Sequence, residues 1–219
     1  MRRGLAAALG VLALGIAWIA PLHVVLPGPF AAHMTMHMGV VAVAAPLLAL
    51  ALAGSPHDPV RHAPWLFAAI PASVVELFAV WGWHAPALHH LARHTTGGLI
   101  AEQAMFLSTG LFVWLSALGG DARDGGSRTG AGIVALLLTS MHMTLLGALL
   151  ALAPRPLYTH AHTHAHDMHG TALAPLDDQQ IGGAIMLLVG GAAYLAGGLG
   201  LVVVLLRRRG APEGARCPS

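Results

Sequence analysis

Long apolar runs separated by short polar segments are the dominant pattern along the chain. Six runs each approach the roughly 20 residues that a helix needs to cross the hydrocarbon core of a bilayer. The segments between them are rich in glycine and proline, which break helices. The runs cover Leu5–Leu26, His33–Ala53, Ala63–Trp81, Leu99–Leu118, Ala131–Ala153 and Ile181–Leu206. This pattern predicts an all-α fold, a polytopic transmembrane helix bundle of about six spans.

The runs follow one another without a second core between them, so residues 1–209 are predicted to form a single transmembrane helical domain. Residues 210–219 are small and polar, and we expect a short disordered cytoplasmic tail there. Arg2 and Arg3 followed by an apolar run also describe a secretory signal. Because no clear small-x-small cleavage site follows that run, we predict that it is a retained helix.

Composition agrees with a membrane protein. Apolar residues make up 56 % of the chain and charged residues 9 %, whereas an ordinary soluble domain has about 25 % charged residues. A soluble fold of 219 residues has too little interior to bury so much apolar surface. Lipid is therefore expected to be the solvent for most of the chain.

The arginines are distributed unequally between the two sides of the predicted bundle. With the N-terminus inside, nine of the eleven arginines lie in cytoplasmic segments, and only Arg93 and Arg155 lie outside. Cytoplasmic loops of membrane proteins carry an excess of positive charge. Both termini are therefore predicted to be cytoplasmic, in a multi-pass protein of the inner (plasma) membrane. The small net charge of +2 gives no reason to expect a nucleic-acid partner.

Histidine has the opposite distribution. Twelve of the fifteen histidines lie in or next to the predicted outer segments: His23, His33, His37, His84, His89, His90, His94, His160, His162, His164, His166 and His169. Such a distribution favours metal binding or pH sensing at the outer face. The only cysteine, Cys217, is in the predicted cytoplasmic tail, so an outer metal site must use nitrogen, oxygen or thioether ligands.

The sequence His33-Met34-Thr35-Met36-His37-Met38 is the sharpest local pattern. Residues four apart share a face of a helix, so His33 and His37 could bind one ion. The thioethers of Met34, Met36 and Met38 are soft ligands that favour Cu(I). The alternative is a pair of interfacial histidines bonded to loop carbonyls, with methionine as lipid-facing filler.

Further candidates lie inside the predicted spans. His142, between Met141 and Met143, is about 16 Å below the outer boundary, at 1.5 Å per residue. A titratable group at that depth should face the bundle interior and have a partner. Among the carboxylates, Glu76 and Glu102 lie near the same level as His33. Asp178 does too, and its alternative role is to cap the N-terminus of the last span.

The alternating histidines from His160 to His166, followed by His169, are typical of a flexible metal-collecting tract. Such a run captures divalent or cuprous ions without imposing a coordination geometry. The pattern indicates metal affinity more strongly than it indicates a function.

Several short motifs occur in the order found in the CtaG-type cytochrome c oxidase assembly proteins. They are His33 to Met38, Trp83-His84-Ala85-Pro86, the stretch from Phe106 to Trp114, Met141-His142, Leu157-Tyr158 and Asp178 to Met186. Over residues 30–190 the chain resembles this family.

The resemblance implies a membrane protein that is needed to mature a heme–copper oxidase, through delivery of copper to its buried catalytic site. The outer-face residues that it implies in this sequence are His33, His37, His84, His142 and Asp178. Two features depart from the family pattern. Members often have a histidine near the start of the fourth span, where this chain has Glu102-Gln103, and some have a seventh span.

We therefore expect an assembly factor, not an enzyme, which binds copper at the outer face and passes it to an oxidase subunit in the membrane. A periplasmic copper donor is a further expected partner. The candidate metal ligands are His33, His37, Met34, Met36, His84, His142, Glu76, Asp178, His160, His162, His164 and His166. Two alternatives stay open: a heme-binding membrane electron carrier with His37 and His142 as axial ligands, and a metal transporter.

Overall fold

The computed structural model describes residues 2–20, 26, 28–120, 125–158 and 173–209. His23, the histidine run from 160 to 169 and the expected tail at 210–219 lie outside the described residues.

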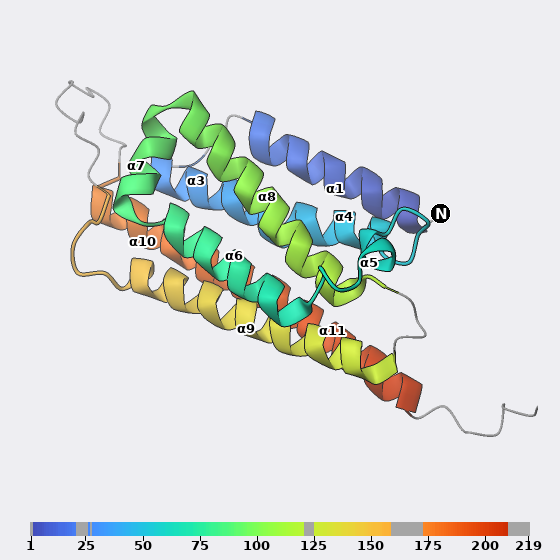
Figure 1. Cartoon of the computed structure of the whole chain (residues 1–219). Coiled ribbons are helices and arrows are strands. Elements are labelled where there is room, and N and C mark those ends of the chain that lie inside the picture. Colours follow the sequence, from blue (N-terminus) through green and yellow to red (C-terminus); the bar gives the residue numbers. More distant parts are fainter. Residues whose placement is uncertain (1, 21–25, 27, 121–124, 159–172, 210–219) are drawn as a thin grey trace, which may run out of the picture.

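Every regular element in the described ranges is a helix, which confirms the all-α class. Figure 1 shows the long helices side by side, with the short helix α7 across one end of the bundle. The elements are α1 (Arg2–Ile19), α3 (Pro29–Met38), η1 (Gly39–Ala44), α4 (Ala45–Leu52), α5 (Pro59–His62), α6 (Ala69–Trp83), α7 (Pro86–His94), α8 (Thr96–Leu118), α9 (Gly125–Ala151), α10 (Pro175–Ile185), η3 (Met186–Gly190) and α11 (Gly191–Arg209).

Four helical segments are long and apolar enough to cross a membrane. They are the continuous rod α3–η1–α4, helices α8 and α9, and the continuous rod α10–η3–α11. Two shorter apolar helices, Arg3–Ile19 and Ala69–Trp83, accompany them. The expected third span is shorter than its apolar run, because the chain turns after Pro64 and α6 begins only at Ala69. The number of six spans stays a prediction.

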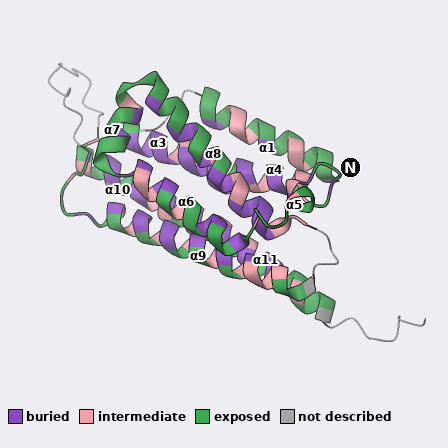
Figure 2. Cartoon of the chain, viewed as in Figure 1, coloured by how far each residue is buried: buried purple, intermediate pink, exposed green. Residues whose placement is uncertain are grey.

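The bundle buries one face of each long helix. The opposite face is exposed and is also apolar. Helix α6 packs between α8 and α9, α9 also packs along α10 and α11, and α1 lies against η1 and α4. Figure 2 shows the buried residues on the inward faces. Large apolar side chains such as Phe78, Met141 and Leu188 are 65–71 % exposed. Outward-facing apolar side chains of this kind are expected where lipid is the solvent.

Close contact between α9 and the α10–η3 rod depends on glycine. A Cβ atom at Gly147 would lie 2.6 Å from the backbone nitrogen of Leu187, so no side chain fits there. Small residues at helix crossings are typical of membrane bundles, because association there depends on close packing.

Hydrogen bonds link the π-helical turn η1 with three other helices near the middle of the bundle. A π-turn interrupts the regular hydrogen bonding of an α-helix. Here the Val41 carbonyl accepts from Trp114 Nε1 at 3.1 Å and from the Tyr194 hydroxyl at 3.3 Å. The Tyr194 hydroxyl also donates to the carboxylate of Glu76. These contacts join η1, α6, α8 and α11 one to two turns below His37.

Helix α3 is fixed at its N-terminus by a remote carboxylate. Proline occupies its first turn, where no backbone N–H is needed. The next two N–H groups, of Phe30 and Ala31, donate to Asp178 of α10 at 2.8 and 2.9 Å. This contact sets the height of α3 relative to α10. We call this end of the bundle, with the starts of α3 and α8 and with α7, the histidine end.

Candidate metal centre

Three helices contribute one buried ligand each at the histidine end. They are His33 of α3, His89 of α7 and Glu102 of α8, which are 2 %, 3 % and 0 % exposed. One ligand atom from each lies within 4.8 Å of the other two. His33 Nδ1 is 3.8 Å from Glu102 Oε2. We call these three residues the triad.

Two further imidazoles lie beside the triad. The ring centroid of His84 is 5.8 Å from that of His33 and 5.2 Å from that of His37. The triad with His37 and His84 is the histidine cluster. His84 follows the last residue of α6, and its Nδ1 is 2.6 Å from the Val80 carbonyl. Because only an N–H can bond a carbonyl, Nδ1 carries the proton and Nε2 keeps its lone pair.

Burial keeps His84 in the state that a metal requires. It lowers the pKa of His84 to about 4, opposed by the bond to Val80 and assisted by the positive charge of Arg93. The ring is therefore neutral near pH 7. Neutral imidazole, and not imidazolium, is the form that binds metals.

Aromatic rings enclose the histidine cluster. Phe106 of α8 lies below it, with a ring-centroid distance of 4.0 Å to His37. Tyr158 lies 4.4 Å from His89 and stacks on Phe30 at 4.6 Å. Its hydroxyl donates to the His84 carbonyl at 2.6 Å, and burial raises the pKa of Tyr158 to about 12, so it stays a neutral donor. These contacts hold Tyr158 over the cluster.

The negative charge of Glu102 is balanced by Arg93 of α7. The guanidinium of Arg93 bonds Glu102 Oε2, and the Gln103 amide donates to the same oxygen at 3.2 Å. Gln103 is in turn held by Trp18 Nε1 at 3.0 Å. The carboxylate is thus oriented by neighbours on α7 and α8, with α1 behind them.

Several buried polar atoms in the cluster have no hydrogen-bond partner among the described residues. They are both ring nitrogens of His33 and of His37, Nε2 of His84 and Oε1 of Glu102. Buried polar groups are normally satisfied, and leaving one unpaired costs about 1–3 kcal/mol. A metal ion would supply the missing partner. Imidazole and carboxylate donors suit copper or zinc better than hard cations.

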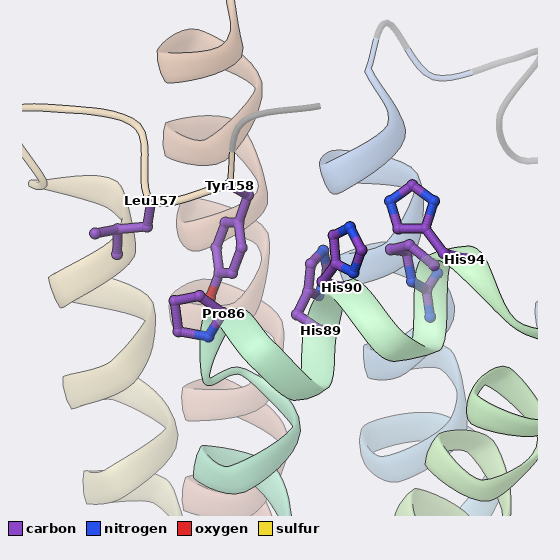
Figure 3. Close-up of a pocket in the computed structure, with 7 residues that line it drawn as sticks. Pro86, His89, His90, His94, Leu157 and Tyr158 are labelled. Atoms are coloured by element: carbon purple, nitrogen blue, oxygen red, sulfur yellow. The ribbon is translucent and has the colours of Figure 1, made fainter. Parts of the chain in front are cut away.

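A surface pocket reaches the edge of the cluster at His89. It has a volume of about 150 Å³, and His89, Arg93 and Tyr158 lie in its walls. Figure 3 shows His89 beside His90 and His94 on α7, with Tyr158 opposite. His89 therefore borders both the pocket and the triad.

The candidate methionines lie on other faces of α3. A Cβ atom at Gly182 of α10 would meet the Met34 side chain at 3.0 Å, so Met34 faces α10. Met36 lines a separate cavity of about 290 Å³ together with Trp18 and Leu99. The structure therefore gathers His33, His37 and His84 but places these thioethers elsewhere.

Three other candidates also have separate environments. Both carboxylate oxygens of Asp178 accept N–H groups of α3, so Asp178 caps α3, whereas α10 itself has Ala174 at its N-cap. Glu76 is bonded by Tyr194 within the core. His142 lines a groove between α6 and α9 of about 710 Å³, together with Ser73 and Leu77. The candidates His160, His162, His164 and His166 lie outside the described residues.

The sequence places Glu102 near the level of His33, but the final set of candidate metal ligands includes neither Glu102 nor His89. The available signal is Arg93, one of only two arginines in the predicted outer segments. A buried carboxylate near it was the natural partner. Arg93 precedes Glu102 by nine residues and follows His89 by four, so this pairing brings α7 onto the start of α8.

The fold and the site together define a helical membrane protein that holds a buried group of imidazoles and a carboxylate at one end of its bundle. The chain belongs to the family of cytochrome c oxidase caa3 assembly factors (Caa3_CtaG), whose sequence profile matches residues 1–208. The resemblance carried by the short motifs is thereby confirmed. No curated protein and no solved structure matches the chain.

The structure gives physical roles to two of those motifs. Asp178 caps α3, which carries His33 and His37. The Gln179 side chain accepts from Leu157 N at 2.6 Å and donates to the Leu150 carbonyl at 3.2 Å. It thereby positions Tyr158 over the cluster. Asp178 and Gln179 therefore position residues of the site but are not themselves part of the histidine cluster.

Proposed function

We propose that this cytochrome c oxidase assembly factor binds copper in the histidine cluster and delivers it to a heme–copper oxidase subunit in the same membrane. The observation that carries the proposal is the buried triad of His33, His89 and Glu102, together with the ring nitrogens of His33 and His37, which have no hydrogen-bond partner among the described residues. A bundle without a ligand for these atoms would be destabilised by them.

The position of the cluster suits transfer better than storage. It lies at one end of the bundle, below a pocket, and His89 comes from the nine-residue helix α7. A short helix at the end of the bundle can move with less cost than a long packed helix, because fewer contacts hold it. Withdrawal of His89 would open the site, and ligands of the partner would then replace His33 and Glu102.

Copper binding by purified protein tests the proposal. His33→Ala and His89→Ala should each weaken copper binding by about tenfold or more, because each removes a ligand of the triad. His142→Ala is the matched control, since His142 is also buried but lies in the groove between α6 and α9. Cells with the triad variants should accumulate oxidase that is deficient in copper. Normal copper binding and normal oxidase in both triad variants would refute the proposal.

The electron-carrier alternative is less well supported by the geometry. Axial ligation of a heme by His37 and His142 requires the two rings to face one another across the macrocycle. His37 instead packs on Phe106 at a centroid distance of 4.0 Å, and His142 lines the groove between α6 and α9. An absorption spectrum of the purified protein separates the two functions, since a bound heme gives a Soret band.

A further inference from the structure

Helix α7 carries a second pair of histidines, which the triad does not use. His90 and His94 are one helical turn apart and both are exposed. Their ring centroids are 3.9 Å apart, with an angle of 37° between the ring planes. Figure 3 shows both rings at the pocket where His89 lies. Small rotations of two exposed rings would place one nitrogen of each on a common ion.

The two faces of α7 separate this pair from the triad. His89 and Ala92 are buried against the bundle, whereas His90 and His94 point outward. His90 directly follows His89, so the exposed pair and the buried ligand are neighbours on one short helix. All three border the same pocket of about 150 Å³.

We propose that His90 and His94 form a surface uptake site that accepts a copper ion and passes it through the pocket to His89 and the triad. This inference rests on the proposed function. Transfer is a stepwise exchange of ligands: the bonds from His90 and His94 to the ion break as the bonds to His89, His33 and Glu102 form. The ion keeps its oxidation state, and no electrons are moved.

The direction of transfer follows from the ligands. Two exposed imidazoles compete with water for the ion and hold it weakly. The triad offers two imidazoles and a carboxylate in a buried site, where electrostatic attraction is stronger. The Arg93 guanidinium lies in the pocket wall and bonds Glu102 Oε2, so exchange of the ion into the triad takes place against a positive charge beside the carboxylate. The uptake site would hold the ion close to the triad until that exchange takes place.

The test compares the full-length double variant His90→Ala/His94→Ala with the wild type and with His57→Ala/His62→Ala. The control pair is also exposed but lies around α5, at the other end of the bundle. The histidine run at 160–169 is present in every protein, so its contribution cancels. The probe is Cu(I) presented with a coloured chelator to protein in detergent. The measurements are the amount bound at saturation and the rate at which copper leaves the chelator.

The double variant should bind less copper at saturation, and its slow, tight site should fill at least about tenfold more slowly, because a tethered ion acts at high effective concentration. The affinity of that tight site should not change. Unchanged filling rate and unchanged capacity would overturn the inference.

His33→Ala separates the inference from the proposed function. This variant should lose the tight site and keep the weak one. If His33→Ala leaves tight binding intact, the proposed function fails, while the loss of weak binding in the double variant still tests the surface pair. If His33→Ala loses the tight site but the double variant keeps the capacity and filling rate of the wild type, the proposed function stands and the uptake site is refuted.

Discussion

The carboxylate of Glu102 has one oxygen, Oε1, without a hydrogen-bond partner among the described residues, and a second, Oε2, that several groups share. Its Oε2 bonds Arg93 and Gln103 and lies 3.8 Å from His33 Nδ1. A metal ion in the triad would bring a second positive charge to the place where the guanidinium already lies. The arginine therefore compensates the acid when no ion is bound and competes with an ion that arrives.

Arg93→Gln should consequently bind copper more tightly, by about tenfold, because each 1.4 kcal/mol of removed repulsion changes a binding constant by that factor. Competition with a chelator measures the affinity. Arg155→Gln is the control, since Arg155 also carries a positive charge near the histidine end but is exposed, whereas Arg93 is half-buried. Weaker binding by Arg93→Gln would instead show that Arg93 serves to hold Glu102 and α7 in place.

His84 makes the stability of the metal-free protein depend on pH. Burial lowers its pKa from 6.5 to about 4. As the pH falls below 6.5, the unfolded chain therefore gains a proton at His84 that the folded chain does not take up. Stability from this residue is complete above pH 6.5 and is lost between pH 6.5 and 4, by up to about 3 kcal/mol.

Melting of the metal-free protein, followed by tryptophan fluorescence from neutral pH to about pH 4.5, measures this loss. His84→Asn keeps a hydrogen-bond donor but does not titrate in this range, so its melting temperature should fall less steeply with pH. Parallel curves for the variant and the wild type would contradict the assignment.

The sequence predicts His33, His37 and His84 of the histidine cluster as ligands but not His89 and Glu102, and one physical reason explains the difference. His33 and His37 are four residues apart on one helix, a spacing that can be read directly from the chain. The triad instead joins three helices, and His89 meets His33 only because α7 folds over the end of the bundle. Contacts between helices depend on packing, which periodicity within one helix does not reveal.

At the scale of the element, α7 decides whether the site exists. Proline at its first turn starts it directly after the His84-Ala85 corner. It ends at His94, and Thr95 then caps α8 by accepting from Gly98 N at 3.0 Å. Residues 82–98 lie between the third and fourth apolar runs, so the sequence predicts an outer connecting segment there and does not predict α7. The long apolar runs, by contrast, identified the main helices, with ends displaced by prolines such as Pro64.

Asp178 can be assigned to helix capping or to metal binding by one substitution. Asp178→Asn keeps an acceptor oxygen but loses the charge that holds two N–H groups of α3. It should lower stability by about 1–2 kcal/mol and leave copper affinity nearly unchanged. Melting temperature and chelator competition on the same preparation give both values. A stable variant with copper affinity reduced tenfold or more would make Asp178 a ligand.

At the scale of the whole molecule, the path of the chain bears on the number of spans. The triad places the start of α3 beside the start of α8. The rod α3–η1–α4 leaves that end, so the chain has to return along α6 before α8 begins. Helix α1 likewise runs the length of the bundle: Arg3 shares a cavity with Gly54 at one end, and Trp18 contacts Gln103 at the other. Both short helices therefore traverse the bundle.

This path of the chain supports six crossings of the membrane, although α1 and α6 are shorter than a typical span. The 15 residues of α6 extend about 22 Å at 1.5 Å per residue, less than the roughly 30 Å of a typical hydrocarbon core. Local thinning of the bilayer accommodates such a mismatch at modest cost. From six crossings and the bias of the arginines we predict that the histidine end lies outside and both termini lie inside.

Reporter fusions at Gly97, between α7 and the body of α8, and at Gly126, at the start of α9, test this topology. A reporter that is active only outside the cytoplasm should be active at Gly97 and silent at Gly126, and a cytoplasmic reporter should give the reverse. The two sites lie at opposite ends of α8, so one fusion controls for expression of the other. An internal Gly97 would place the histidine cluster in the cytoplasm and would exclude metal uptake from the outer face. Equal activity at both sites would mean that α8 does not cross the membrane, and the bundle would then need another arrangement in the bilayer.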